Sequence, residues 1–209
     1  MNISELKPNI IIGQYYKGEL MLPSWAGFQS RQGSYASKNS NKASDGLVKV
    51  FITGKEVDGV KVTTAEQVNA VKYLIDNADN VRDALLLGLL HEMPGLEDIY
   101  EDLLPEVHKI EDFQDVIGLA NIHLMESDKE GFAYVGFELG CNWDEDHGVG
   151  VMMHKDRVVA VGQATTAFDC WVTFDDNGTT EVETKKWHEA NEKLRLERQK
   201  TQKKWWKFW

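Results

Sequence analysis

The feature that most constrains the fold of this 209-residue chain is an alternation of apolar residues within Tyr134–Gly162. Alternation is clearest in Val149–Met153, before a turn at Lys155–Asp156, and Arg157–Val161 has the composition of a returning strand. Because successive side chains of a strand point to opposite faces, such a segment buries one apolar face. It therefore predicts antiparallel strands around a polar corner, Trp143–His147, which we call the corner.

Other β-rich runs predict a sheet built from both ends of the chain. We expect an N-terminal hairpin over Ile10–Leu22 that turns at Lys17–Gly18, and a C-terminal hairpin that turns at Asn177–Gly178. Between these ends, the sequence indicates an ordered loop over Ser24–Asp45, pinned by its aromatic residues Trp25, Phe28 and Tyr35. The remaining predicted strands are Leu47–Ile52, Val57–Val62, Ile117–Met125 and Tyr134–Cys141, and the C-terminal hairpin joins Cys170–Phe174 to Thr179–Thr184.

Two helices are predicted in the middle of the chain. Thr64 and Gln67 have the spacing of a capping box, so a helix should begin there and run to about Asn77. A second helix, apolar on nearly all sides, should be capped by Asn80 and end at Pro94-Gly95. The sequence thus predicts an α+β fold: an antiparallel sheet formed by N-terminal and C-terminal hairpins, a central helical pair and a C-terminal amphipathic helix.

Composition bounds the organisation of the chain. With 42% hydrophobic residues, the chain can bury a core without disulfides. We expect one α+β domain over 1–184, with a helical insert at about 64–116, and a basic, Trp-rich helix over 185–209. Two cysteines, no long apolar run and no basic leader predict a cytoplasmic protein with reduced thiols.

Charge is distributed unevenly. Residues 184–209 carry nine Lys or Arg against three Glu, a charge of +6, which leaves −17 for the rest of a chain whose net charge is −11. An acidic body argues against nucleic-acid binding and is compatible with a basic partner. The amphipathic tail has three open interpretations: it folds back, it docks on a partner, or it contacts an anionic membrane through Trp205–Trp209.

The corner is the main candidate site. Its carboxylates can cap backbone N–H groups, contact a partner or bind a metal, and these alternatives remain open. A metal set would draw on Asp144, Asp146, His147 and His154. The spacing of these residues matches no zinc or calcium motif, and the sequence contains no phosphate-binding or nucleophile-elbow motif. We therefore predict no cofactor and no catalytic residue.

Two longer segments resemble the signatures of an uncharacterised bacterial family, a domain of unknown function. They are Leu22–Tyr35 with Ser44-Asp45-Gly46, and Tyr134–Val151 with His154, Arg157 and Gly162. Some members of that family are found near toxin and immunity genes, so the resemblance implies a protein that binds and neutralises a partner. Within these segments, the candidate partner-binding residues are Trp25, Arg31, Trp143, Asp144, Glu145, Asp146 and His147.

Two functional hypotheses follow from the sequence. The first is a non-enzymatic, cytosolic protein-binding protein, an immunity protein whose acidic surface blocks a basic toxin. The alternative is a metal-binding domain or metal-dependent enzyme that uses Asp144–His147.

Overall fold

The computed structural model describes residues 10–12, 15–32, 37–53, 55–57, 60–100 and 103–205. These residues divide into two compact units, one that ends at Thr173 and one that begins at Phe174. Because compactness does not by itself define an independently folding domain, the predicted boundary between residues 184 and 185 stays a prediction.

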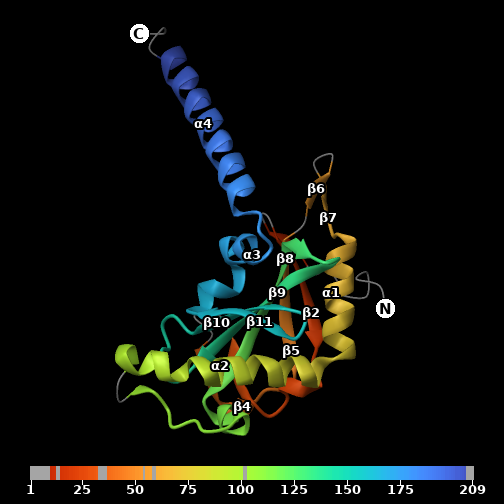
Figure 1. Ribbon diagram of the computed structural model, residues 1–209, viewed down its shortest axis with the longest axis vertical. Helices are drawn as coiled ribbons and strands as arrows, with labels where there is room; N and C mark the ends of the chain where they lie inside the picture. The colour runs from red at the N-terminus through yellow and green to blue at the C-terminus, as the bar shows by residue number, and fades with distance from the viewer. Residues whose placement is uncertain are drawn as a thin grey trace. The chain divides into compact units, whose positions relative to one another are not determined.

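A mostly antiparallel, seven-stranded sheet forms the centre of the first unit (Figure 1). Its strand order is β1-β2-β5-β8-β9-β10-β11, and only the β5–β8 pair is parallel. The parallel pair arises because both central helices lie between β5 and β8 in the chain. The strands are β1 (Ile10–Ile12), β2 (Tyr15–Met21), β5 (Leu47–Thr53), β8 (Ile117–Lys129), β9 (Phe132–Cys141), β10 (Val149–His154) and β11 (Arg157–Gly162).

Helices α1 (Ala65–Asp76) and α2 (Ala78–Tyr100) cover one face of this sheet. The predicted capping box is present, since the Thr64 hydroxyl accepts from the Gln67 backbone N–H at 3.2 Å and the Gln67 side chain accepts from the Thr64 backbone N–H at 3.0 Å. Alternate residues of the strands, such as Val135 and Phe137, pack against these helices in the main core. The predicted α+β class and central helical pair are confirmed.

The opposite face of the sheet is partly covered by shorter elements. Gly136 faces this side, and the backbone of Ala167 in the 3₁₀ helix η6 (Ala164–Phe168) lies directly against it. A small second core gathers there from the sheet and from α3 (Cys170–Asp176). The other short elements are η2 (Pro23–Trp25), β3 (Gln29–Gln32), β4 (Ser37–Ala43), β6 (Lys55–Val57), β7 (Val60–Val62) and η5 (Ile110–Asp115).

Several local predictions in the N-terminal half were wrong. Lys17 and Gly18 lie inside β2 rather than at a turn. The expected loop over Ser24–Asp45 contains the β3–β4 pair, although Trp25 and Phe28 are buried as predicted; Tyr35 lies outside the described residues. Likewise, Val57–Val62 is not one strand, because β6 and β7 pair antiparallel.

Helix α2 does not end at Pro94 but continues to Tyr100. A proline in a helix interior removes one hydrogen bond and crowds the preceding turn, so it usually terminates or kinks the helix. Here Met93, just before the proline, is buried in the main core. Leu96 and Tyr100, which follow the proline, pack against the same core. Tertiary packing on both sides of Pro94 therefore holds the helix together.

The predicted C-terminal hairpin was also wrong, because its two segments lie in α3 and in α4 (Thr180–Trp205). Gly178, with φ of +75°, ends α3: its N–H donates to Asp175 O at 3.2 Å, and the Thr179 N–H donates to Phe174 O at 2.8 Å. This pair of bonds is a helix-terminating Schellman motif. An Asn-Gly pair satisfies both a hairpin turn and this motif, since each needs a glycine at positive φ.

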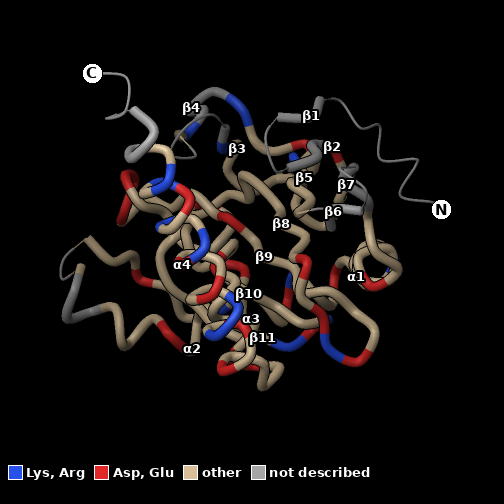
Figure 2. Tube along the Cα trace, turned by 90° about the horizontal axis from the view of Figure 1, so that it is seen from above, with Lys and Arg blue, Asp and Glu red and all other residues tan. Residues whose placement is uncertain are grey.

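Within the second unit, α4 confirms the predicted C-terminal helix and extends it five residues toward the N-terminus. Figure 2 shows basic and acidic residues interleaved along this helix, and ion pairs join Lys186 to Glu183 at 2.7 Å and Arg195 to Glu192 at 2.8 Å. Trp206–Trp209, part of the expected membrane contact, lies outside the described residues. Of the helices in the described part of the chain, none is long and apolar enough to cross a membrane.

Candidate functional site

The corner connects β9 to β10, and Asp144 organises it. The Asp144 Oδ1 atom accepts the His147 backbone N–H at 3.0 Å and lies 2.9 Å from His147 Nδ1. On its other side, Asp144 Oδ2 accepts the Tyr100 hydroxyl at 2.8 Å. One carboxylate therefore caps the turn and ties the last residue of α2 to the corner.

These contacts shift the pKa of both partners. Burial raises the pKa of Asp144, but hydrogen bonds from Tyr100 and from the backbone and ring of His147 outweigh it, so the net pKa is lowered. Burial, together with the hydrogen bond to the Asp144 carboxylate, raises the pKa of Tyr100 to about 12. Across the neutral range, an ionised Asp144 thus accepts from a neutral Tyr100.

The other polar residues of the corner do not converge with Asp144. Glu145 and Asp146 are exposed, and the His147 side chain is 61% exposed. His154 lies at the far end of β10, where its Nε2 contacts Lys129 O at 2.8 Å and its ring lies against Tyr134. Within the candidate metal set, the side chains of Asp144 and His147 contact each other, and no group of three potential metal ligands occurs within the described ranges.

Arg31 is the centre of a buried polar network that joins the two signature segments. It is only 4% exposed, and its guanidinium donates to Gln29 Oε1 at 2.9 and 2.5 Å and to Asn142 Oδ1 at 2.8 Å. Gln29 Nε2 also donates to Asn142 Oδ1, at 3.0 Å, and to Asp115 O. Asn142, at the base of the corner, is 111 positions from Arg31 and 113 positions from Gln29. These hydrogen bonds therefore fix the base of the corner to β3, and the Gln29–Asp115 bond connects it to η5.

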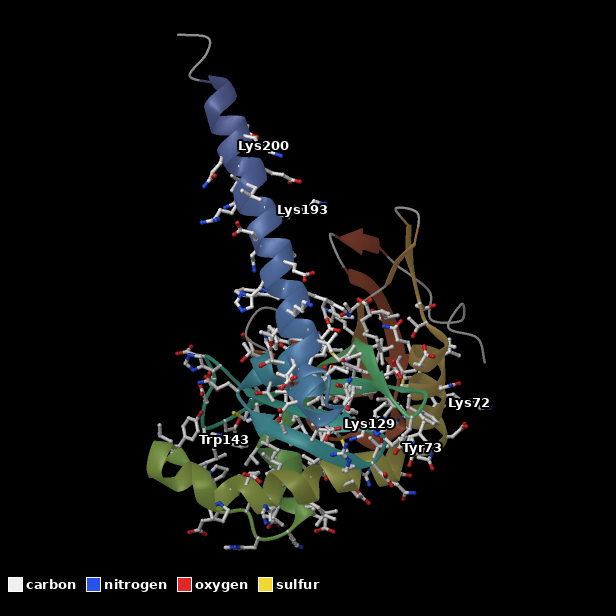
Figure 3. All side chains as sticks on the ribbon, turned by 45° about the horizontal axis from the view of Figure 1, so that its top comes forward. Lys72, Tyr73, Lys129, Trp143, Lys193 and Lys200 are labelled. Atoms are coloured by element: carbon white, nitrogen blue, oxygen red, sulfur yellow. The ribbon has the colours of Figure 1, made fainter. Side chains whose placement is uncertain are left out.

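Both candidate tryptophans are buried. Trp25 is 2% exposed and packs on Phe28 with ring centroids 4.9 Å apart. Trp143 is 4% exposed and belongs to the main core, at the end of the sheet beside α2 (Figure 3). Since Arg31 is buried as well, direct contact with a partner at this site would fall to the exposed residues Glu145, Asp146 and His147.

With this geometry established, comparisons with known proteins place the chain in a family. A family model described as a domain of unknown function, DUF6985, matches residues 18–168. The chain belongs to this family. The matched range contains both signature segments, so the Arg31 network lies within the part of the chain that defines the DUF6985 match. No curated protein and no solved structure matched the chain.

A second polar cluster of this DUF6985 protein was not predicted from sequence. On the sheet face opposite the two helices, Glu138 Oε2 accepts from Asn121 Nδ2 at 2.9 Å and lies 2.8 Å from His123 Nε2. The His123 ring stacks on Phe51 and contacts the tilted ring of Phe168, with centroids 5.2 and 4.9 Å away. Burial raises the pKa of Glu138, but hydrogen bonds from His123 and Asn121 outweigh it and lower the pKa overall.

Sequence reasoning missed the residues that hold the corner in place, namely Tyr100, Gln29 and Asn142. Gln29 and Asn142 stand inside the two signature segments, so their presence there was the available signal. Tyr100 lies beyond Pro94, and the expectation that the helix ends at the proline concealed it. All three act by fixing the backbone and carboxylates of the corner.

Proposed function

We propose that this DUF6985 protein is a non-enzymatic binding protein that neutralises a basic protein partner, as an immunity protein neutralises its toxin. The proposal rests on an acidic surface, defined here by the exposed residues Glu111, Asp115, Glu145 and Asp146. Its two segments are held together by hydrogen bonds, because the side chains of Asn142 and Gln29 both donate to Asp115 O. The backbone that carries this acidic surface is thus held in place before a partner binds.

Preorganisation and charge supply what such a function needs. A partner that meets carboxylates on a fixed backbone does not pay the cost of ordering that backbone, and a body of charge −17 attracts a basic protein over a distance of about a Debye length. The Tyr100 hydroxyl and the backbone N–H of His147 already occupy Asp144, so the corner offers Glu145 and Asp146 to a partner. These features suit electrostatic recognition of a basic toxin domain.

Co-expression tests the proposal. The chain is expressed together with a toxin domain encoded beside its gene, and we expect restored growth and a complex that survives gel filtration. The double substitution Glu145→Lys/Asp146→Lys should weaken the complex at least about tenfold, because it reverses two charges on the acidic surface. If growth is not restored and no complex forms, the proposed function is wrong.

A matched control separates local recognition from net charge. Glu126→Lys/Glu130→Lys changes the net charge by the same amount, but these exposed residues lie toward the opposite end of the β8–β9 pair, where Lys129 pairs with Phe132. The corner follows the end at which Ile117 pairs with Cys141. Equal weakening by both double substitutions would show that net charge alone, and not the acidic surface, governs binding.

A further inference from the structure

A groove of about 560 Å³ lies beside the acidic surface. One wall is the loop that begins at η2, the second is the N-terminal half of α2, and the third is η5. The volume falls within the range of about 300–1,000 Å³ that is typical of ligand pockets. Because η5 supplies both Glu111 to the groove and Asp115 to the acidic surface, the two features adjoin.

The walls of the groove are cross-linked by side chains. Arg82 Nη1 donates to Ser24 O at 2.9 Å and to Asp79 Oδ1 at 3.1 Å, while Arg82 Nε and Nη2 donate to Asp83 Oδ1 at 2.9 and 2.7 Å. Across the groove, Gln114 Nε2 donates to Gly27 O at 3.2 Å. The groove is therefore preformed, and the charge of Arg82 is already compensated by two carboxylates.

The lining combines an apolar floor with an acidic rim. Phe28 and Leu86 are buried beneath the groove. At the rim, the Asp79 side chain is 77% exposed, the Asp83 side chain is 41% exposed, and Glu111 is exposed. Three carboxylates against the single guanidinium of Arg82 leave the lining net negative.

Ser24 places an unpaired hydroxyl behind this wall. The residue is only 9% exposed, and its Oγ atom is buried without a hydrogen-bond partner in the described part of the protein. Buried hydroxyl groups normally have a partner, since an unpaired one costs roughly 1–3 kcal/mol. The groove thus combines an apolar floor with an excess of carboxylate, and the unpaired Ser24 hydroxyl is buried behind its wall.

We propose that this groove receives an arginine side chain of the basic partner. The inference rests on the proposed function and names the place where that partner is anchored. The aliphatic part of an arginine fits the apolar floor, and its planar guanidinium has five donors for Glu111 and for the Oδ2 atoms of Asp79 and Asp83, whose Oδ1 atoms accept from Arg82. Partly buried arginines of this kind are frequent anchor residues of protein interfaces.

The groove is tested first with a probe that needs no partner. The full-length protein is titrated with acetyl-Leu-Arg-Leu-amide and, separately, with the same peptide containing citrulline, a neutral analogue of arginine. We expect changes in the NMR shifts of the backbone amides of Ser24, Ala26 and Glu111. Affinity should be at least about threefold lower for the citrulline peptide and for the Asp79→Asn/Glu111→Gln variant, because each removes a charge-assisted contact.

A second variant blocks the groove physically. Ala26 is exposed and has an extended backbone, so Ala26→Trp should place a large ring in the groove without disturbing the core. It should abolish the peptide-induced shifts, while Glu126→Gln, on the distant end of β8, should leave them unchanged. Equal binding of both peptides, shifts confined to other regions, or no shift at millimolar peptide would each overturn the inference.

The toxin complex separates this inference from the proposed function. If the complex forms and Ala26→Trp binds the toxin as tightly as the unmodified chain, the groove inference is wrong and the proposed function stands. If no toxin complex forms while the arginine peptide still binds at Ser24 and Ala26, the proposed function is wrong and the groove remains an arginine site.

Discussion

Arg31 shows how a single residue organises the family signatures. Although charged, it is 4% exposed, and burial lowers its pKa while the neighbouring Cys141 and Glu145 groups act in the opposite direction. Its position is tolerated because the amide oxygens of Gln29 and Asn142 accept its N–H groups. The first signature thus supplies the arginine and one acceptor, Gln29, and the second supplies the other acceptor, Asn142.

Gly136 marks a close approach that admits no side chain. A Cβ atom at this position would lie 1.6 Å from Ala167 O, which belongs to the backbone of η6. Gly136→Ala should therefore lower the free energy of unfolding by at least about 2 kcal/mol, measured by urea denaturation. The control is Gly95→Ala in α2, where a Cβ meets nothing within 4 Å and should stabilise the protein by about 0.5–1 kcal/mol. A neutral Gly136→Ala would contradict the packing of η6 on β9.

The Tyr100–Asp144 hydrogen bond should make stability depend on pH in two windows. Tyr100→Phe keeps the ring and removes the hydroxyl, so it should cost about 1 kcal/mol near neutral pH. The pKa of Asp144 is lower in the folded state than in the unfolded state. Its contribution to the free energy of unfolding is therefore present above the unfolded pKa of about 3.9 and is lost as pH falls through the folded pKa. The pKa of Tyr100 is raised to about 12 in the folded state. Its contribution to the free energy of unfolding is therefore complete below the unfolded pKa of about 10 and is lost as pH rises toward the folded pKa.

Unfolding free energies between pH 3 and pH 11, measured for both proteins, check this prediction. The difference between them should be constant from roughly pH 5 to pH 9 and should shrink on either side. In an Asp144→Asn background, Tyr100→Phe should lose its acid dependence, since the titrating carboxylate is absent. A difference that does not vary with pH would contradict the role of this pair.

At the scale of elements, local signals predicted some features and not others. The Thr64 capping box and the strand over Val149–Met153 depend on neighbours in the chain, and the structure confirms both. The alternation predicted a single buried face, but every residue of β10 is buried, because η6 and the second core cover its other face. Asn177-Gly178 is ambiguous for a physical reason, since a hairpin turn and a helix end need the same positive φ. The Tyr100–Asp144 bond joins residues 44 positions apart. A periodic pattern of side chains along the chain does not predict such a long-range contact. The sequence therefore located the corner but not Tyr100, Gln29 and Asn142, which hold it in place.

Helix α2 provides a prediction about elements. Pro94 lies in the interior of the helix, where proline leaves one carbonyl without its donor and costs up to about 3 kcal/mol relative to alanine. Pro94→Ala should therefore raise the free energy of unfolding by about 1–3 kcal/mol, measured by urea and thermal unfolding. Pro105→Ala, outside any helix, should be neutral or slightly destabilising. If both substitutions behave alike, the continuous α2 helix is wrong.

At the scale of the whole molecule, charge and apolar exposure set two different regions apart. The chain outside residues 184–209 carries −17, whereas α4 combines basic residues with Trp187 and Leu194, which are 55% and 50% exposed. Docking on a partner, folding back and membrane contact all stay predictions for this helix. The acidic surface and the groove both belong to the first unit, and under the proposed function they act in two distinct steps of binding.

Association kinetics should resolve these two steps. Exposed carboxylates act at long range and set the rate of encounter, whereas a buried anchor mainly sets the rate of release. Under the proposed function, Glu145→Lys/Asp146→Lys should therefore lower the association rate constant for the basic partner and reduce its dependence on salt. Ala26→Trp should instead raise the dissociation rate constant at least about tenfold with little change in the association rate constant.

Surface plasmon resonance between 50 and 500 mM salt, roughly the range over which exposed charges become screened, measures both constants. If both variants change only dissociation, long-range steering by the acidic surface is wrong, because a steering contribution must appear in the association rate.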